Sequence, residues 1–396
     1  MLSKKIIALF MTVIVVVGVI SGCGSANSSG SGDLEVIKIA TQTPLSGGSA
    51  TLGEAIKLGA QLAIEEKKAE FAEKGFDLQL VPYDDQADPK KGVSNAQSIA
   101  SDEQILGVIG HLNSGVAIPA SEVYQNYSIP MVSPANTAVE MTDRPGMTVV
   151  NRICARDDFQ GPAGAEFAVN TLNATKIFII QDKTAYGSGL AEAFRDAAEE
   201  LGAEIVGYEG ITVGEKDFNG VLSQAVSKDP DLIYFGGIYT EGGLIIKQAR
   251  EKGLDIPIMG GDGLDSSSTV EIAGDAVKNV FITSAAGETT KTEAGKKFAD
   301  NYKAEFNKNI ESYSAYGYDS AGVYLQGLAD AIEANEGKLP TREQVSEAVR
   351  AIKDYQGIVT NVSFDEKGDN EYAKIFIYEF ADVAYPGSLV EEIENK

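Results

Sequence analysis

Residues 177–201 read IFIIQDKTAYGSGLAEAFRDAAEEL, and this stretch decides the class of fold. Its first four residues are an apolar run rich in isoleucine, which with Gln181 predicts a short buried strand over 177–181. After it, apolar residues recur at the helical steps of 4, 3 and 4, at Leu190, Phe194, Ala197 and Leu201. A strand followed by a helix of this length is typical of a parallel sheet that helices cover on both faces.

The same alternation continues on both sides of this stretch. Short runs rich in β-branched residues predict further strands at 36–40, 78–83, 105–109, 130–133, 232–235, 256–259 and 280–283. Helical patterns lie between them, one of which begins at Asp88-Pro89, an N-cap acid followed by proline at the first helical position. About 360 residues of this pattern exceed one open sheet, so we expect two doubly wound α/β lobes. Such sheets bind ligands outside the carboxyl ends of their strands.

The composition excludes several classes of protein. The chain has 396 residues, 33 Lys and Arg against 58 Asp and Glu, and a formal net charge of −25. A nucleic-acid binder needs a basic face, so this balance argues against nucleic acid as a partner. With two cysteines, one histidine (His111) and no tryptophan, the chain offers neither a disulfide framework nor a histidine-rich metal site.

The N-terminal segment is predicted to be an export leader. Lys4 and Lys5 precede an apolar run over 6–20 that is too short for a membrane span, which needs about 20 residues. The sequence Ile20-Ser21-Gly22-Cys23 then resembles a bacterial lipobox, which implies a signal peptide over 1–22 and a lipid on Cys23. Residues 24–33 are almost all Gly, Ser, Ala and Asn, so 23–34 is expected to be a lipidated flexible tether. The alternative is an uncleaved anchor helix followed by an incidental cysteine.

Polar loops follow the predicted strands. Those at 43–48, 110–115 and 133–137 place hydroxyls and free amides just before helices, an arrangement suited to an anion. Asp262 lies among glycines after a later strand, where it can pair with a cation, and Tyr186 opens a helix. One zwitterion, an α-amino acid, would satisfy both kinds of group, although each residue taken alone is as readily a helix cap, a turn residue or a packing residue. No nucleophile elbow, phosphate loop or H-E-x-x-H motif is present, so no catalytic residue is predicted.

From residue 35 to about 378 the sequence resembles the periplasmic leucine/isoleucine/valine-binding proteins, the amino-acid-binding components of ABC importers. The stretches that carry the resemblance include 83-YDDQADPK-90, Gly110-His111-Leu112, Gln160-Gly161-Pro162, Asp182-Lys183 with Tyr186-Gly187, Gly210-Ile211-Thr212 with 214-GEKDF-218, Gln248-Ala249-Arg250 and 365-DEKGD-369. The resemblance implies a type I periplasmic binding protein fold, two parallel-sheet lobes joined by a three-crossover hinge. Lobe 1 would comprise 35–155 and 286–372, and lobe 2 would comprise 156–285 and 373–396.

The resemblance also implies roles for individual residues. Ser114 and Thr137 match hydroxyls that hold the ligand carboxylate, and Ala135 and Thr137 match acceptors for the ammonium. Asp262 matches an acid that pairs with the ammonium, and Tyr186 matches a ring that joins the ligand when the lobes close. The whole predicted ligand-binding set is Leu52, Leu112, Asn113, Ser114, Ala135, Asn136, Thr137, Tyr186, Ile238, Tyr239, Asp262 and Tyr313. No cofactor and no metal are predicted.

The sequence departs from the family pattern at several positions. Ala87 and Asn113 stand where the family has a disulfide. Leu52 and Ile238 (with Tyr239 beside it) replace aromatic residues, and Tyr313 stands where the family has a phenyl ring. The first expectation is therefore a branched-chain or other aliphatic amino acid; alanine, threonine or an aromatic or amide-bearing amino acid remains open.

The predicted function is a monomeric binding lipoprotein on the outer face of the cytoplasmic membrane that delivers an amino acid to ABC permease subunits. A sensory module of the same fold, which presents its ligand to a receptor, is the main alternative. An exported enzyme on an α/β scaffold is a third.

Overall fold

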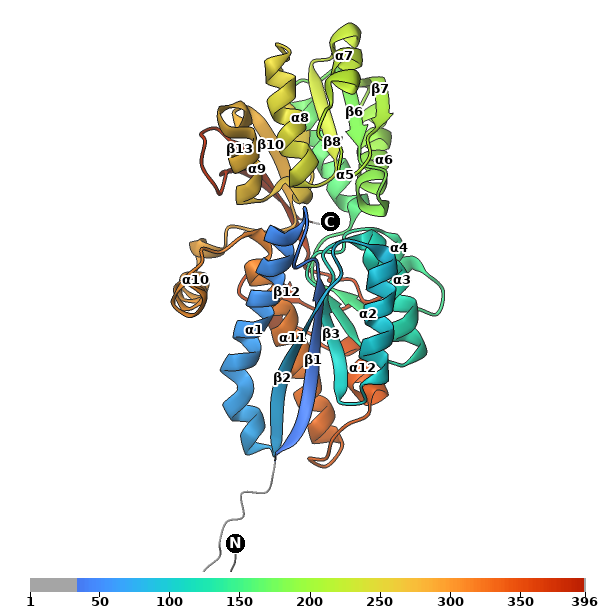
Figure 1. The fold of residues 1–396 in the computed structure, drawn as a ribbon, viewed down its shortest axis with the longest axis vertical. Helices are drawn as coiled ribbons and strands as arrows, with labels where there is room; N and C mark the ends of the chain where they lie inside the picture. Colours follow the sequence, from blue (N-terminus) through green and yellow to red (C-terminus); the bar gives the residue numbers. More distant parts are fainter. Residues whose placement is uncertain (1–33, 395–396) are drawn as a thin grey trace, which may run out of the picture. The chain divides into compact units, whose positions relative to one another are not determined.

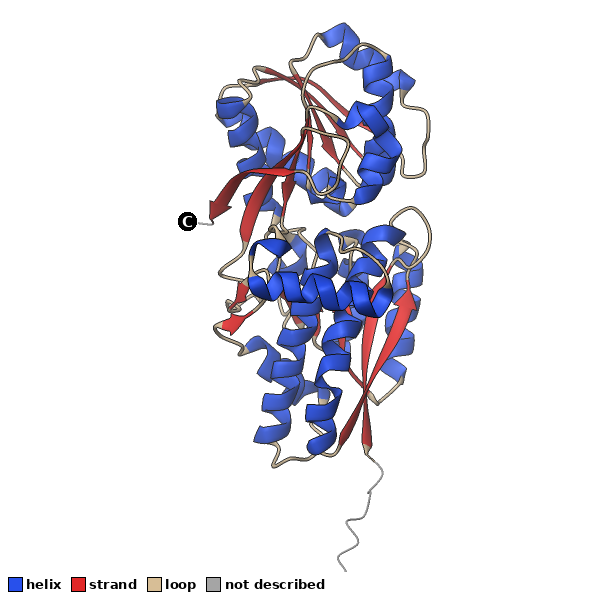
Figure 2. Cartoon of the chain, turned by 90° about the vertical axis from the view of Figure 1, so that its left-hand side faces the viewer, coloured by secondary structure: helices blue, strands red, loops and turns tan. Residues whose placement is uncertain are grey.

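The computed structural model describes residues 34–394, so the predicted leader, Cys23 and nearly all of the tether lie outside the described residues. Within the described part, the strands form two large sheets with helices on either side (Figures 1 and 2). None of these helices combines the length and apolar character that a membrane crossing requires.

The sheet of lobe 1 has five parallel strands in the spatial order β2-β1-β3-β4-β5. Their bounds are β1 (Glu35–Thr43), β2 (Phe76–Asp84), β3 (Ile105–Gly110), β4 (Met131–Ser133) and β5 (Val150–Arg152). Its helices are α1 (Ala50–Glu73), α2 (Pro89–Ser101), α3 (Ser114–Asn126), α4 (Glu140–Asp143), α10 (Glu293–Phe306), α11 (Ser312–Ala334) and α12 (Arg342–Arg350). Every residue of β3 is buried, as expected for a central strand covered on both faces.

The sheet of lobe 2 has seven strands in the order β14-β13-β10-β9-β8-β6-β7. Their bounds are β6 (Lys176–Gln181), β7 (Glu204–Gly210), β8 (Leu232–Gly236), β9 (Ile258–Gly260), β10 (Val280–Ser284), β13 (Lys374–Phe380) and β14 (Ser388–Glu394). The first five of these run parallel, whereas β13 pairs antiparallel with β10, and β14 pairs antiparallel with β13. The helices are α5 (Asp157–Glu166), α6 (Ala185–Glu200), α7 (Asn219–Lys228), α8 (Tyr239–Glu251) and α9 (Ser267–Ala273).

The chain passes between the two sheets three times: after β5, after β10, and before β13. The last crossing follows a small hairpin of β11 (Tyr355–Gln356) and β12 (Asn361–Val362). Two of the crossings are tied together by Asp369, whose carboxylate accepts from Arg152 Nε at 2.5 Å and from Arg156 Nη1 at 2.7 Å. Burial opposes ionisation of Asp369, but the two guanidinium groups outweigh it and lower the pKa of this acid. The predicted fold class, two parallel-sheet lobes with three crossovers, is confirmed.

Local signals in the sequence explain where key helices begin. Asp88 accepts a hydrogen bond from Lys91 N at 2.9 Å, so Asp88-Pro89 starts α2 as expected. Thr184 caps α6 in the same way, accepting from Gly187 N at 2.9 Å. The cap of α6 sets the position of the loop between β6 and α6, and that loop forms part of the site described next.

Candidate functional site

Loops after the strands of both sheets surround a cleft of about 570 Å³. It is lined by nine of the predicted residues: Leu52, Leu112, Asn113, Ser114, Ala135, Tyr186, Ile238, Asp262 and Tyr313. In the described part of the chain, a second hollow of about 470 Å³ lies between α1 and α11, but none of its lining side chains carries a buried polar atom without a partner. The cleft has three such side chains, Asn113, Ser114 and Asp182, and this distinguishes it as a binding site.

The wall contributed by lobe 1 is organised by Asn136. Its Oδ1 accepts from His111 N at 3.0 Å and from Ser133 Oγ at 2.8 Å, and its Nδ2 donates to Leu112 O at 3.0 Å. Asn136 does not line the cleft; it holds the 110–115 loop in place behind it. Ser114, the first residue of α3, has a buried hydroxyl without a hydrogen-bond partner, next to first-turn amides that a helix cannot satisfy internally. Such a group is suited to a carboxylate.

Thr137 lies buried behind the cleft, in contact with an acid that sequence reasoning missed. Asp157 N donates to Thr137 O at 2.9 Å. Neither Thr137 Oγ1 nor either carboxyl oxygen of Asp157 has a partner of normal geometry among the described residues. Burial, together with the nearby charge of Asp262, raises the pKa of Asp157 to about 8. The only sequence signal for Asp157 was its place at the start of the first helix after a crossing.

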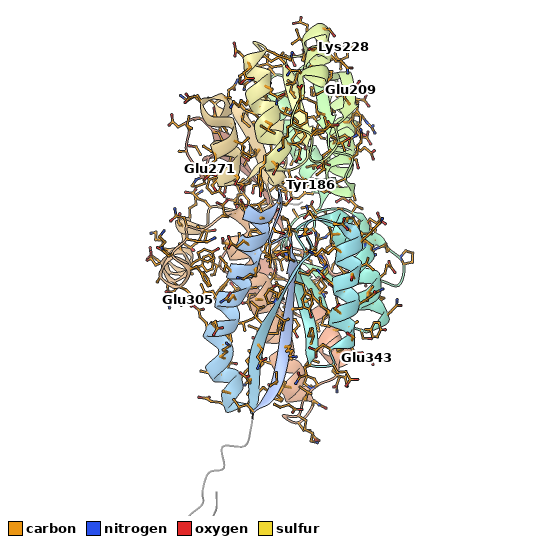
Figure 3. All side chains as sticks on the ribbon, viewed as in Figure 1. Tyr186, Glu209, Lys228, Glu271, Glu305 and Glu343 are labelled. Carbon is orange, nitrogen blue, oxygen red and sulfur yellow. The ribbon has the colours of Figure 1, made fainter. Side chains whose placement is uncertain are left out.

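The wall contributed by lobe 2 is centred on Asp262, which follows β9. Its Oδ1 accepts from Tyr186 Oη at 2.7 Å and from Gln160 Nε2 at 2.8 Å, and its Oδ2 accepts from the Tyr313 hydroxyl. Gln160 Oε1 in turn accepts from Asp262 N at 3.1 Å. Burial raises the pKa of Asp262, although the hydroxyls of Tyr313 and Tyr186 favour its ionised form. Figure 3 shows Tyr186 at the junction of the lobes. Gln160 was quoted in the sequence only as part of a motif, and its support of Asp262 required the structure.

Polar contacts between the lobes border the cleft. Tyr239 does not line it, because its hydroxyl accepts from Thr51 N at 3.1 Å instead. Glu311, just before α11, accepts from Ser267 N at 3.0 Å and from Ser267 Oγ at 2.5 Å. A further contact joins Thr240 of lobe 2 to Gly48 of lobe 1: Thr240 Oγ1 donates to Gly48 O at 2.5 Å. The two walls are thus in direct contact around the cleft.

Cys154 is buried, and burial raises the pKa of its thiol far above the ordinary value, so it is not a nucleophile. Within residues 34–394, no group of three or more His, Cys, Asp or Glu side chains is arranged to hold a metal ion. The site presents unpartnered polar groups on one wall and an acid on the other, and both line a shared cavity.

Known proteins share this architecture. The family model described as "Periplasmic binding protein" matches residues 36–382. The chain is 35% identical over 347 residues to the Leu/Ile/Val-binding protein homolog 2 of Brucella abortus, covering 87% of this chain and 90% of that protein. The leucine-binding protein LivK of Thermotoga maritima superposes with a TM-score of 0.81 at 30% identity, covering 90% of this chain and 98% of that one. The substrate-binding protein LivJ of Streptococcus pneumoniae, solved with isoleucine, also has a TM-score of 0.81, at 26% identity, with coverage of 91% and 100%.

These findings define a solute-binding protein rather than an enzyme. The chain belongs to the periplasmic binding protein family, and its relatives include proteins named Leu/Ile/Val-binding protein homologs.

Proposed function

We propose that this protein is an extracytoplasmic lipoprotein that captures an amino acid between its lobes and delivers it to the permease of an ABC importer. The observation that carries the proposal is the polarity of the cleft: the unpartnered hydroxyl of Ser114 lies on the wall of lobe 1, and Asp262 lies on the wall of lobe 2. The carboxylate and ammonium of an α-amino acid match these two groups, and charge-assisted hydrogen bonds are the strong kind.

The ligand contacts follow from this orientation. Ser114 and the first amides of α3 hold the carboxylate, and Ala135 O accepts from the ammonium, with Thr137 directly behind this wall. Asp262 carries the opposing charge, and Tyr186 closes over the ligand. Leu52, Leu112 and Ile238 provide the apolar surface for the aliphatic carbons, so leucine, isoleucine and valine are the first candidates.

The lobes are proposed to close on the ligand about the three crossings, with lobe 1 as 35–155 and 286–372 and lobe 2 as 156–285 and 373–396. Support comes from the two sheets, which divide the strands in this way, and from the arginine–Asp369 contacts that join the crossings. Hinge closure around a ligand is a common mode of domain motion.

A thermal-shift screen of the mature chain with the twenty amino acids tests the proposal. Ligand at a hundred times its dissociation constant stabilises the folded state by about 2.7 kcal/mol. We expect a raised Tm with at least one aliphatic amino acid. If no amino acid raises the Tm, the proposal is wrong.

The membrane anchor is a separate part of the proposal. Cleavage after residue 22 would expose Cys23, and a diacyl group on it would hold a monomeric protein at the outer face of the cytoplasmic membrane, since two chains anchor stably where one does not. Mass spectrometry of the mature chain should find the lipid on Cys23. A Cys23→Ala variant should leave the membrane fraction; retention there would contradict the anchor.

A further inference from the structure

Asp182 is a polar group in the cleft that the proposed ligand contacts do not use. It follows β6, and its Oδ1 accepts from Thr184 N at 2.9 Å and from Thr184 Oγ1 at 2.6 Å. These two bonds are sufficient for the turn into α6. The other oxygen, Oδ2, is buried without a hydrogen-bond partner. Asp182 as a whole is 2% exposed and lines the cleft. Asp182 therefore has one acceptor atom, Oδ2, that no described residue satisfies.

The surroundings of Asp182 do not satisfy that acceptor. Glu241, 4% exposed, also lines the cleft, and its Oε1 accepts from Gly214 N at 2.8 Å. Burial raises the pKa of Asp182, and the charge of Glu241 adds to this effect. Lys183 lines the cleft too, but it is exposed and its Cε lies over Gly210 at the end of β7. Two acids therefore share this end of the cleft.

A second unpartnered acceptor is on the facing lobe. Asn113 precedes α3, its side chain does not cap that helix, and its Oδ1 is buried without a partner. The N-termini of α3 and α6 approach each other here, since a Cβ placed on Gly115 would lie 3.9 Å from Ala185 N. Asn113 and Asp182 thus belong to facing loops that line the same cleft.

Both acceptors are already buried without a partner, and a purely aliphatic ligand would leave them in that unfavourable state. A ligand whose side chain carries an O–H or N–H group would satisfy at least one of them. Sites built to hydrogen-bond a ligand discriminate strongly against the analogue that lacks the polar group.

We propose that Asp182 and Asn113 form a polar subsite that selects, between amino acids of equal size, the one whose side chain donates a hydrogen bond. This inference rests on the proposed function. It names the substrate class more narrowly: amino acids that combine an aliphatic portion, packed on Leu52 and Ile238, with a donor at the end of the side chain.

Calorimetric titration of the mature chain with matched ligands tests the subsite. Threonine and valine have the same shape, and glutamine and norleucine are of similar length. We expect the donor-bearing member of at least one pair to bind about 10-fold more tightly. Lysine, titrated in parallel, shows by its rank whether the two acids prefer a cationic or a neutral donor. Equal or tighter binding of the apolar member in both pairs would overturn the inference.

Two variants show whether these residues cause the preference. Asp182→Asn keeps the acceptor for Thr184 but places an NH₂ group at the Oδ2 position, and Asn113→Leu removes the facing amide. Each should reduce the donor-to-apolar affinity ratio several-fold. Asp231→Asn, the same change at an acid that accepts from Thr175 N at 2.9 Å and Thr175 Oγ1 at 2.6 Å and does not line the cleft, should leave the ratio unchanged. The ratio is the readout because a loss of stability alone would weaken both ligands equally.

The outcomes separate the two proposals. Failure of every amino acid to bind the parent chain would refute the proposed function. Binding of leucine or valine without a donor preference, or an unchanged ratio in both variants, would refute the subsite alone.

Discussion

The two walls of the cleft differ in how they use their polar groups. On the lobe 1 side, the hydroxyls of Ser114 and Thr137 are buried without partners of normal geometry. On the lobe 2 side, Asp262 already accepts from Gln160, Tyr186 and Tyr313. The first wall is preorganised, so ligand bonds are added to it at no cost in existing bonds. On the second wall, a ligand must share Asp262 with side chains that already donate to it. One of these donors, Tyr313, comes from lobe 1, so Asp262 also joins the two lobes. Under the proposed function, the ligand would add bonds to lobe 1, whereas at lobe 2 it would share an acid already in use.

The largest effect is expected from removal of the acid of lobe 2. Asp262→Ala should weaken amino-acid binding by about 3 kcal/mol, or roughly 100-fold, because a buried ammonium would lose its charged partner. Calorimetry measures the change. Asp319→Asn is the matched control, because Asp319 is a buried acid in α11 that accepts from Ile358 N and Val359 N away from the cleft. If Asp262→Ala binds as tightly as the parent, Asp262 is not the ammonium partner.

Asp157 should make the stability of the ligand-free protein depend on pH. Burial raises the pKa of Asp157 to about 8, so between about pH 4 and pH 8 the folded state keeps a proton that the unfolded state has lost. Stability from this group is therefore fully present below pH 4 and is lost as the pH rises, by up to about 1.4 kcal/mol per pH unit. Asp157→Asn should remove that slope in urea unfolding measured from pH 5 to pH 8. Parallel curves for parent and variant would contradict the assignment.

The preorganised wall can be tested with two serines of the same helix. Ser114→Ala should weaken ligand binding about 10-fold without lowering the free energy of unfolding, since its hydroxyl has no partner to lose. Ser121 Oγ donates to Ile118 O at 2.8 Å and accepts from Arg144 Nη2 at 2.6 Å. Ser121→Ala should therefore lower stability by about 1 kcal/mol and leave affinity unchanged. Urea unfolding and calorimetry on both variants decide the matter; the opposite pattern would show that Ser114 has a structural role.

The smallest effect is expected at the contact between the lobes. Glu311→Gln keeps the length of the side chain but removes the charge that Ser267 hydrogen-bonds. Ligand affinity should fall a few-fold, and small-angle scattering should show a more open average state in the presence of ligand. Glu293→Gln alters an exposed acid that pairs with Lys296 at 2.8 Å, and it should change neither quantity. An unchanged scattering profile for Glu311→Gln would mean that this contact does not favour closure.

The predicted strands and their loops correspond closely to the structure because the signals are local. Parallel strands covered on both faces are continuous apolar runs, and β3 and β8 are buried throughout. β7 was not predicted, since it is an edge strand with half-exposed residues and no apolar run. β13 and β14 were also missed; they come late in the chain, beyond the alternating strand-and-helix pattern, and pair antiparallel.

The candidate site was only partly accessible to sequence reasoning. Ser114 and Asp262 could be selected because both follow strands, and the carboxyl ends of parallel strands share one edge. Asp157, Gln160 and Asp182 could not be assigned a role in this way. Each depends on which groups remain without partners after the chain has crossed between sheets and the lobes have met, which no local pattern records. The same holds for Tyr239, which was expected to line the cleft and instead contacts Thr51.

The sequence by itself determined the two-lobed α/β class and the loops that carry the binding residues, because strand and helix periodicities and helix caps act over short distances. Only the tertiary structure decided how the site works. It placed Tyr313 of one lobe on Asp262 of the other, buried Asp157 beside Thr137, and left Asp182 and Asn113 as facing acceptors without partners. The reason is physical: hydrogen-bond satisfaction and desolvation depend on all neighbours in space, and most of those neighbours are far apart in the chain.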